Sequence, residues 1–383
     1  MLPLTGTRVL DFTRHLPGPF ATDLLRRLGA EVFKIEPPDG DPTRWLPPWK
    51  DDDGALFALL NGGKRSVAVD LKSEAGRAFV HRLTALCDVA VESYRPGIAR
   101  TFQIDADTLR RINPTLIYCS ISGFGAQDRR SAHDLNFAAL SGLLDLQRDG
   151  DGRPILPGTQ VGDASGALFA ALSIVAALDE RKSSGQGREL DISLADATRA
   201  VMPSAESFYR GTGIRPDQYF LTGAFPGYAV YRTADGQYLA VAPLEQHFWA
   251  QFCQAIGHPE LVSKQLDEGK RSAVFATIAG TIAMRTRQEW EGIFSKIDAC
   301  VEPVLTIDEA HERFGDVSER HPLQKNFPMV SFPAEPLGAS LSYAAEVAGL
   351  AQAEIEALEQ SAGFRTRLKL KKLLIKVRTT LRR

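Results

Sequence analysis

The chain has 383 residues, 44% of them hydrophobic and 24% charged, which is ordinary for a globular protein and enough for two or three domains. No apolar run approaches the roughly 20 residues that cross a bilayer, and no signal-peptide pattern follows Met1. The net charge of −2 is uneven, because residues 364–383 hold nine Lys or Arg and no acid, which leaves 36 basic and 47 acidic residues in the rest.

Short apolar strands alternate with amphipathic helices in the first third of the chain. Strands are predicted at 8–12, 31–35, 66–71, 88–92 and 116–121, and helices at 18–28, 74–86 and 106–112. This alternation predicts an α/β fold with a Rossmann-like parallel sheet. The turn after the first strand, 13–19, lacks G-x-G-x-x-G, and no G-x-x-x-x-G-K-[ST] occurs anywhere, so a nucleotide would have to bind in another way.

After residue 135 the pattern is mainly helical and then changes again. Helices are predicted at 135–146, 164–181, 195–209, 245–256, 273–284, 288–297 and 353–360, and further strands at 189–193 and 301–305. A hairpin is predicted around the Asp235-Gly236 turn. We expect a large Rossmann-like domain (1–210), a linker (211–226), a smaller α+β domain (227–320), a return to the large domain (321–363) and a basic tail (364–383).

The tail places Leu370, Leu373, Leu374, Val377 and Leu381 at helical spacing among basic residues. This pattern is typical of an amphipathic helix that binds an anionic membrane surface or an acidic partner. A solvated C-terminal extension is the alternative.

Six basic residues lie near the predicted strand ends: Lys34, Lys64, Arg65, Lys72, Arg95 and Arg100. Such a cluster suits a phosphorylated ligand, and solvated loop charges are the alternative.

The four cysteines are scattered, without C-x-x-C or histidines at zinc-ligand spacing. They are Cys87, Cys119, Cys253 and Cys300. We expect buried reduced thiols and a cytoplasmic location.

His133, Asp163 and Glu245 each lie at the start of a predicted helix. Burial or a neighbouring group can tune any of them into a general base. The structural alternatives are an N-cap at Asp134 with His133 in a loop, and an N-cap at Asp163. Spacing alone does not select among them.

Seven segments carry a resemblance to a known family. They are 61–72 (NGGKRSVAVDLK), 92–97 (ESYRPG), 116–125 (LIYCSISGFG), 133–137 (HDLNF), 161–163 (VGD), 231–236 (YRTADG) and 298–305 (DACVEPVL). With them the chain, from about Gly6 to Gly363, resembles the family III CoA-transferase superfamily. Within that superfamily it is most similar to the α-methylacyl-CoA racemases.

The resemblance implies an interlocked homodimer and coenzyme A bound at the strand ends of the large domain. The residues that match CoA-contacting segments are Asp70, Leu71, Lys72, Ser93, Tyr94, Arg95 and Arg100. Coenzyme A is then part of the substrate, and no prosthetic group, metal or nucleic-acid partner is expected. Two positions depart from the family pattern. Pro37 occupies a position where an arginine is frequent. Thr101 occupies the position of a second family arginine, which in this chain lies one residue earlier, at Arg100.

The resemblance also assigns His133 and Asp163 as catalytic, with Glu245 orienting His133 from across the cleft. Asp134 and Tyr228 are expected in the substrate pocket. Thr159 and Gln246 depart from the family pattern, which has Asn and Pro at these positions.

These roles imply 1,1-proton transfer at the α-carbon of a 2-methylacyl-CoA thioester, with His133 and Asp163 on opposite faces. Backbone N–H groups at the start of the helix after Asp163 would stabilise the enolate. The main alternative is CoA transfer between carboxylic acids with Asp163 as nucleophile, although members of that branch commonly lack the histidine. A non-catalytic acyl-CoA-binding protein is the remaining alternative.

Overall fold

The computed structural model describes residues 1–50, 53–149, 151–215, 220–316, 321–328 and 332–361, and their contacts divide the chain into two units. Among the described residues, the first contains those of 1–141 and 157–201 and those after 320, and the second contains those of 142–156 and 202–316. Residues 142–156 and 202–210 thus cluster with the second unit, whereas the sequence placed them in the large domain. The predicted basic tail, 364–383, lies outside the described residues.

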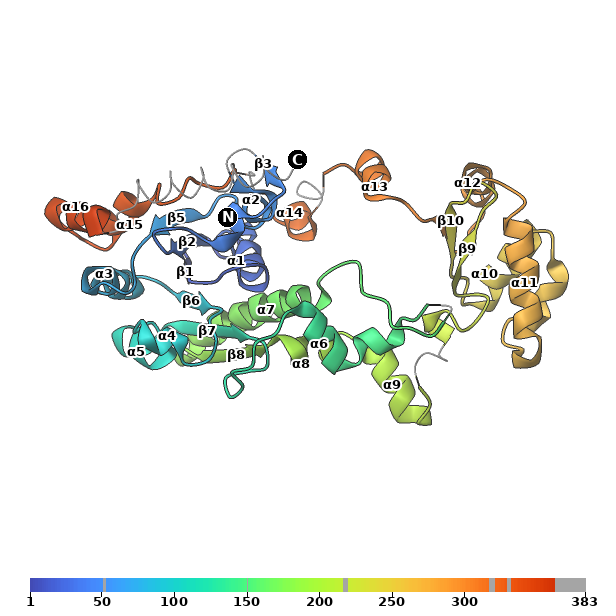
Figure 1. Ribbon diagram of the computed structural model, residues 1–383, viewed down its shortest axis with the longest axis horizontal. Helices are drawn as coiled ribbons and strands as arrows, with labels where there is room; N and C mark the ends of the chain where they lie inside the picture. Colours follow the sequence, from blue (N-terminus) through green and yellow to red (C-terminus); the bar gives the residue numbers. More distant parts are fainter. Residues whose placement is uncertain (51–52, 150, 216–219, 317–320, 329–331, 362–383) are drawn as a thin grey trace. The chain divides into compact units, whose positions relative to one another are not determined.

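A six-stranded, fully parallel sheet forms the centre of the first unit, as the sequence predicted (Figure 1). The strands, in spatial order, are β5 (Arg65–Ala68), β2 (Glu31–Glu36), β1 (Arg8–Asp11), β6 (Val89–Glu92), β7 (Ile117–Ser122) and β8 (Glu189–Ser193). From β1 the chain runs outward through β2 to β5 and then returns to β6 on the other side of β1. The strand order therefore reverses between β1 and β6, where α/β proteins bind ligands outside the carboxyl ends of the strands.

Helices cover both faces of this sheet, as a buried parallel sheet requires. The helices of the unit are α1 (Pro17–Arg27), α2 (Ala55–Asn61), α3 (Glu74–Thr84), α4 (Ile98–Thr101), α5 (Ala106–Ile112), α6 (Asp134–Ser141), α7 (Val161–Ser184), α8 (Leu194–Ala200), α14 (Pro322–Asn326), α15 (Leu341–Val347) and α16 (Gln352–Ser361). The short turn η1 (Pro42–Trp45) and the ribbon of β3 (Trp49–Lys50) and β4 (Asp53–Gly54) follow β2.

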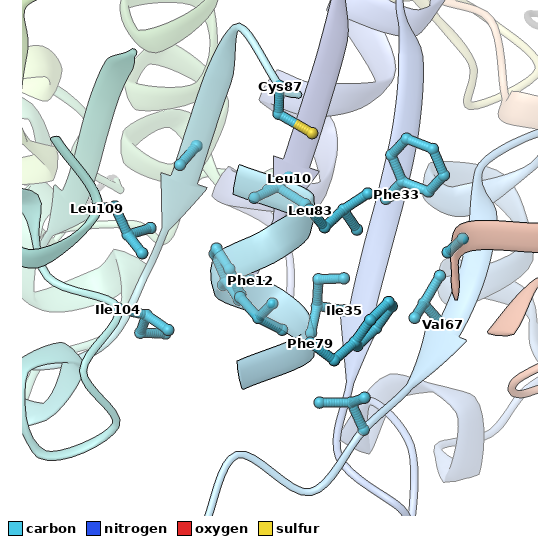
Figure 2. Packing of buried hydrophobic residues seen from close by; sticks show 14 of the residues in the cluster. Leu10, Phe12, Phe33, Ile35, Val67, Phe79, Leu83, Cys87, Ile104 and Leu109 are labelled. Atoms are coloured by element: carbon cyan, nitrogen blue, oxygen red, sulfur yellow. The ribbon is translucent and has the colours of Figure 1, made fainter. Parts of the chain in front are cut away.

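Two hydrophobic clusters lie on opposite faces of the sheet because successive strand side chains alternate. Leu10 and Phe33 pack with α3, α5, α15 and α16 on one face (Figure 2). Val9 and Val32 pack with α1 and α7 on the other. The sheet is thus buried on both sides, and its ligand-binding edge is left to the loops.

Three helix boundaries differ from the sequence-based prediction. Helix α6 ends at Ser141 because Gly142 adopts φ +89°, so the predicted helix 135–146 is interrupted. The predicted helix 195–209 is broken into α8 and α9 (Pro203–Thr212) at Met202-Pro203. Helix α7 begins at Val161, so Asp163 is its third residue and does not precede it.

The second unit has a three-stranded antiparallel sheet packed with helices. Its elements are η2 (Leu143–Leu146), α9, η4 (Phe220–Thr222), β9 (Ala229–Arg232), β10 (Tyr238–Val241), α10 (Gln246–Ala255), η5 (Pro259–Lys264), η6 (Glu268–Lys270), α11 (Arg271–Ile282), α12 (Arg287–Phe294), β11 (Val301–Pro303) and α13 (Ile307–Phe314). The predicted β9–β10 hairpin is confirmed, with Gly236 at φ +79° in its turn. Trp249 and Trp290 are fully buried in the core of this unit.

Helix α7 is long and apolar enough to span a membrane by length and composition, contrary to the prediction that no apolar stretch of the chain is. Half of its apolar window is buried within the protein, where Ala167, Ala170 and Ile174 contribute to the core shared with α1. Core helices of globular proteins can have this same length and apolar composition.

Three of the four cysteines are buried, as expected, but Cys300 is exposed and has φ +49°. None of the four forms a disulfide.

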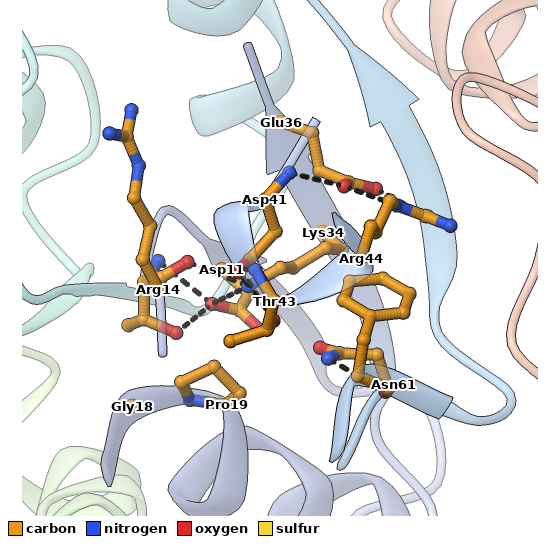
Figure 3. Close-up of polar contacts among 12 residues, drawn as sticks. Asp11, Arg14, Gly18, Pro19, Lys34, Glu36, Asp41, Thr43, Arg44 and Asn61 are labelled. Atoms are coloured by element: carbon orange, nitrogen blue, oxygen red, sulfur yellow. Dashed lines mark hydrogen bonds and ion pairs between the residues drawn. The ribbon is translucent and has the colours of Figure 1, made fainter. Parts of the chain in front are cut away.

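A buried cluster of charged groups lies under the loop that follows β1 (Figure 3). Asp11 is fully buried, and its carboxylate pairs with Lys64 at 3.1 Å and with Lys34 at 3.9 Å. Lys34 also pairs with Asp41 at 3.2 Å and donates to the carbonyl of Thr13 at 2.6 Å. Burial opposes the ionised carboxyl, but the two lysines and the hydroxyls of Thr13 and Thr22 outweigh it and lower the pKa of Asp11 to about 2.

Replacing Asp11 by Asn should lower the free energy of unfolding by about 3–5 kcal/mol, because it leaves the buried Lys64 without its paired carboxylate and Lys34 with Asp41 alone. Urea denaturation followed by circular dichroism measures the change. The folded pKa lies below the ordinary value of 3.8, so the advantage of the wild type is present above about pH 4 and is lost as the pH falls towards 2. Asp179→Asn, at an exposed ion pair of α7, is the matched control, and an equal loss in both variants would contradict the prediction.

Candidate active site

The His133 imidazole is presented by a capped helix start. His133 precedes α6, its backbone N–H donates to Asn136 Oδ1 at 3.0 Å, and its carbonyl accepts from the N–H of Asn136 at 2.8 Å. Phe137, one residue further, is buried in the core between the sheet and α7. This segment fixes the backbone of His133 and leaves its side chain exposed. His133 therefore occupies the N-cap position that the structural alternative gave to Asp134.

Asp134 instead caps a different helix. Its Oδ1 accepts the backbone N–H of Asp163 at 2.9 Å, which satisfies one of the unpaired donors in the first turn of α7. The N-cap residue of α7, Gln160, makes no side-chain cap bond of its own. Gly162 permits this approach, because a Cβ there would lie 3.0 Å from Asp134 Oδ1 and 2.7 Å from Thr198 Oγ1. The residue after His133 is thus bonded directly to Asp163, which brings the His133 and Asp163 segments together.

The Asp163 carboxyl is in an environment suited to proton transfer at neutral pH. Burial, and to a lesser extent the negative charge of Asp134, together raise its pKa from 3.8 to about 7. A carboxyl with this pKa is present in both protonation states near pH 7, as a group that alternately takes and returns a proton must be.

The expected enolate donors are only partly available. The N–H of Asp163 is bonded to Asp134, and the N–H of Ala164 is bonded to the carbonyl of Gln160 at 3.0 Å. Within the described part of the chain, the N–H groups of Val161 and Gly162 have no such acceptor. The free donors therefore lie before Asp163 and not after it.

The loop between β1 and α1 lies beside His133. His15, in this loop, has a backbone φ of +67°, a conformation that residues other than glycine seldom adopt. Burial lowers the pKa of the His15 imidazole, and the charges of Asp41, Arg14 and His133 also act on it. His15 is therefore within electrostatic range of His133.

The same loop meets the turn after β6, at the point where the strand order reverses. The backbone N–H of Arg14 donates to Ser93 Oγ at 3.0 Å, and its guanidinium lies 5.1 Å from the centre of the Tyr94 ring. Glu92 shapes this turn by accepting the N–H of Tyr94 at 2.6 Å. The predicted contacts Ser93 and Tyr94 thus lie at the edge of the sheet where a ligand is expected.

Comparison with known proteins identifies the family. The model of CoA-transferase family III matches residues 4–343. The chain belongs to CoA-transferase family III.

Relatives of two kinds match this family III chain. It is 35% identical to the mouse (Mus musculus) alpha-methylacyl-CoA racemase over 316 residues, which cover 80% of the chain and 79% of the relative. It is 31% identical to the mouse succinyl-CoA:glutarate CoA-transferase over 343 residues, covering 86% and 78%. The crystal structure of a CAIB/BAIF family protein from Brucella suis matches with a TM-score of 0.76 at 26% identity, covering 91% of this chain and 99% of that one.

The six basic residues that the sequence grouped at the strand ends have different environments. Lys34 and Lys64 are fully buried and ion-paired, so they neither contact solvent nor remain free for a phosphate. Arg65 pairs with Glu335 at 3.2 Å, and Arg100 pairs with Asp107 at 2.7 Å. The charge of Arg100, a predicted CoA contact, is therefore already balanced.

The other predicted CoA contacts lie at strand ends of the same sheet. Asp70, Leu71 and Lys72 follow β5, where Asp70 Oδ1 accepts the N–H of Lys72 at 2.9 Å. Lys72 and Arg95 are exposed, and neither pairs with a carboxylate among the described residues. These two remain available for an anionic ligand.

Glu245 and Tyr228 belong to the second unit. Glu245 is exposed at the N-cap of α10, and its side chain makes no cap bond to that helix. Gln246, which replaces a family proline, donates to the carbonyl of Val262 at 3.2 Å. The orienting role of Glu245 and the pocket role of Tyr228 stay predictions from the resemblance.

Three residues of the site were missed from the sequence: Arg14, His15 and Glu92. The signal for the first two was their position directly after the first strand, because loops at the carboxyl ends of central strands line α/β ligand sites. For Glu92 the signal was an acidic residue ending an otherwise apolar strand. No group of three or more His, Cys, Asp or Glu side chains in the described ranges is placed to hold a metal ion.

Replacing Asp134 by Asn should lower the pKa of Asp163 from about 7, because the negative charge is removed while the amide oxygen can still cap α7. Burial remains, so the pKa should stay above 3.8. A ¹³C NMR titration of the Asp163 carboxyl measures the change. Asp134→Ala, which also removes the cap, should in addition cost about 1 kcal/mol of stability. An unchanged Asp163 pKa in the Asn variant would contradict this account.

Replacing Glu92 by Gln should stabilise the protein at pH 8 and have little effect near pH 4.5. Burial raises the pKa of Glu92 from 4.5 to about 7, so its ionised form becomes increasingly unfavourable as the pH rises through this range. The shift corresponds to a gain of up to about 3 kcal/mol above pH 7. Thermal unfolding at both pH values tests this, with the exposed Glu346→Gln as control. A variant that is less stable at pH 8 than the wild type would refute it.

Proposed function

We propose that this family III protein moves the α-proton of a 2-methylacyl-CoA thioester by a two-base, 1,1-proton transfer and so racemises that carbon. The observation that carries the proposal is Asp163, a carboxyl with a pKa of about 7 whose backbone is bonded to the residue next to His133. The names of the relatives do not choose the reaction, since racemases and CoA-transferases match at similar identity.

In the forward direction one base removes the α-proton, and the electron pair of the broken C–H bond moves into the thioester as an enolate. The conjugate acid of the other base then returns a proton to the opposite face. His133 supplies the nitrogen base, and Asp163 supplies the carboxyl group, whose role reverses with the direction of reaction. The N–H groups of Val161 and Gly162, which have no acceptor among the described residues, would donate to the enolate oxygen.

The alternative reaction, CoA transfer, makes a different demand on Asp163. A nucleophile that attacks a thioester must be ionised, and it gains nothing from burial that favours the protonated form. A carboxyl that protonates near neutral pH suits proton exchange better. The imidazole of His133, whose chain neighbour Asp134 is bonded to Asp163, has a direct task in racemisation as the second base, whereas the transferase reaction assigns it none.

The two-base mechanism predicts which enantiomer each variant can still exchange. In D₂O, the wild type should convert either single enantiomer of 2-methylacyl-CoA to a deuterated racemate without any acceptor acid. Asp163→Asn and His133→Gln should each reduce racemisation by about 10²–10⁴-fold. Each variant should retain α-deuterium exchange with only one enantiomer, and the two variants should retain opposite ones, because each keeps the base on one face.

Mass spectrometry and chiral chromatography measure exchange and racemisation separately. Asp179→Asn on α7 and His81→Gln on α3, a partly buried histidine outside the site, are matched controls that should behave as the wild type. Acceptor-dependent movement of CoA, with hydroxylamine trapping at Asp163 and no α-exchange, would establish the transferase reaction instead.

A further inference from the structure

Arg14 occupies a central position at the edge of the sheet. It lies in the loop after β1, and the strand order reverses between β1 and β6. Its backbone N–H is held by Ser93 Oγ at 3.0 Å, and its Nη2 is 3.5 Å from the Tyr94 hydroxyl. The guanidinium therefore lies against the turn after β6, beside Ser93 and Tyr94, two of the residues predicted to contact coenzyme A.

The charge of Arg14 is not balanced within the protein. No carboxylate of the described ranges lies within 4 Å of its guanidinium, whereas Lys34 and Lys64, which contact the same loop and α1, are ion-paired. The paired cations nearby in the sequence are Arg26 and Arg27 with Asp23, Lys34 with Asp41, and Arg44 with Glu36. In Figure 3 the Arg14 side chain extends away from the buried Asp11 cluster, which neutralises other cations but not this one.

Hydrogen bonds to the buried Asp11 cluster hold the loop that carries Arg14. Thr13 donates its backbone N–H to Asp11 Oδ1 at 2.9 Å and its hydroxyl to the same oxygen, while its carbonyl accepts from Lys34. The backbone of Arg14 is therefore fixed on both sides before any ligand arrives. A ligand that binds Arg14 therefore causes only a small loss of conformational entropy in this loop.

We propose that Arg14 binds a phosphate group of the CoA ligand and is a specificity-determining residue of this site. The proposal rests on the proposed function, since it takes acyl-CoA as the substrate. The Arg14 guanidinium lies over the Tyr94 ring, and a guanidinium can donate to two phosphate oxygens at once. Phosphate groups occur at two places in coenzyme A, in the diphosphate and at the ribose 3′ position, and both offer this chemistry.

Isothermal titration calorimetry with three probes tests the assignment. The probes are coenzyme A, 3′-dephospho-CoA and pantetheine, which has no phosphate. Arg14→Gln should weaken coenzyme A binding by about 10- to 100-fold. Arg14→Lys should recover part of this loss, because it keeps the charge but not the two-pronged geometry. Arg82→Gln, at an exposed ion pair of α3, makes the same charge change and should bind within about twofold of the wild type.

The probes distinguish the two phosphate sources. If Arg14→Gln weakens binding of coenzyme A but not of 3′-dephospho-CoA, Arg14 contacts the 3′-phosphate. Equal losses for both place Arg14 at the diphosphate. In either case pantetheine should bind the variant and the wild type alike, measured by competition if its affinity is low.

Three results would overturn the assignment. The first is coenzyme A binding to Arg14→Gln that equals binding to the wild type. The second is a loss of affinity in Arg82→Gln as large as that in Arg14→Gln. The third is pantetheine binding that falls in parallel with coenzyme A binding. The last result would mean that Arg14 only supports Tyr94. A wild-type protein that does not bind coenzyme A would contradict the proposed function itself, whereas wild-type binding that is insensitive to Arg14 would contradict this inference alone.

Discussion

The buried pairing of Asp11 with Lys34 and Lys64 is the interaction on which the ligand-binding edge depends. Three charges, from β1, β2 and the residue before β5, meet beneath the loop after β1, where an isolated ion would be strongly unfavourable. Through Thr13, this cluster determines the path of the chain after β1, and that path determines where Arg14 and His15 lie. Its contribution is thus more to the geometry of the edge than to net stability, since buried ion pairs only partly offset the cost of desolvation.

The second constraint is the capping of α7 by Asp134, a residue of α6, which brings the two proposed catalytic segments together. Asp134 supplies the acceptor that Gln160 does not, and the same carboxylate raises the pKa of Asp163. One side chain therefore has a structural and an electrostatic role. The bonded Asp134–Asp163 contact also explains why glycine occupies position 162, where a Cβ would press against Asp134 and Thr198.

Much of the fold could be predicted from the sequence because apolar periodicity reports directly on burial. The parallel sheet and the β9–β10 hairpin followed from it. Helix ends at Gly142 and Met202 were harder, since a φ above zero and a proline break do not alter the apolar pattern. Lys34 and Lys64 were misjudged because a lysine near a strand end has the same sequence signature whether it faces solvent or a buried Asp11. Contacts among Arg14, Ser93 and Tyr94 depend on strand order, which local sequence does not encode.

The placement of His133 and Asp134 side by side in the chain links two properties that a protein engineer would wish to adjust separately. A substitution that moves the start of α6 would displace the His133 imidazole. By moving Asp134, it would also change the pKa of Asp163. Changes at positions 134 and 163 should therefore be strongly epistatic, because the charge of Asp134 contributes to the raised pKa of the Asp163 carboxyl. Transfer of this arrangement to another protein would consequently require both helices, α6 and α7, together with Gly162.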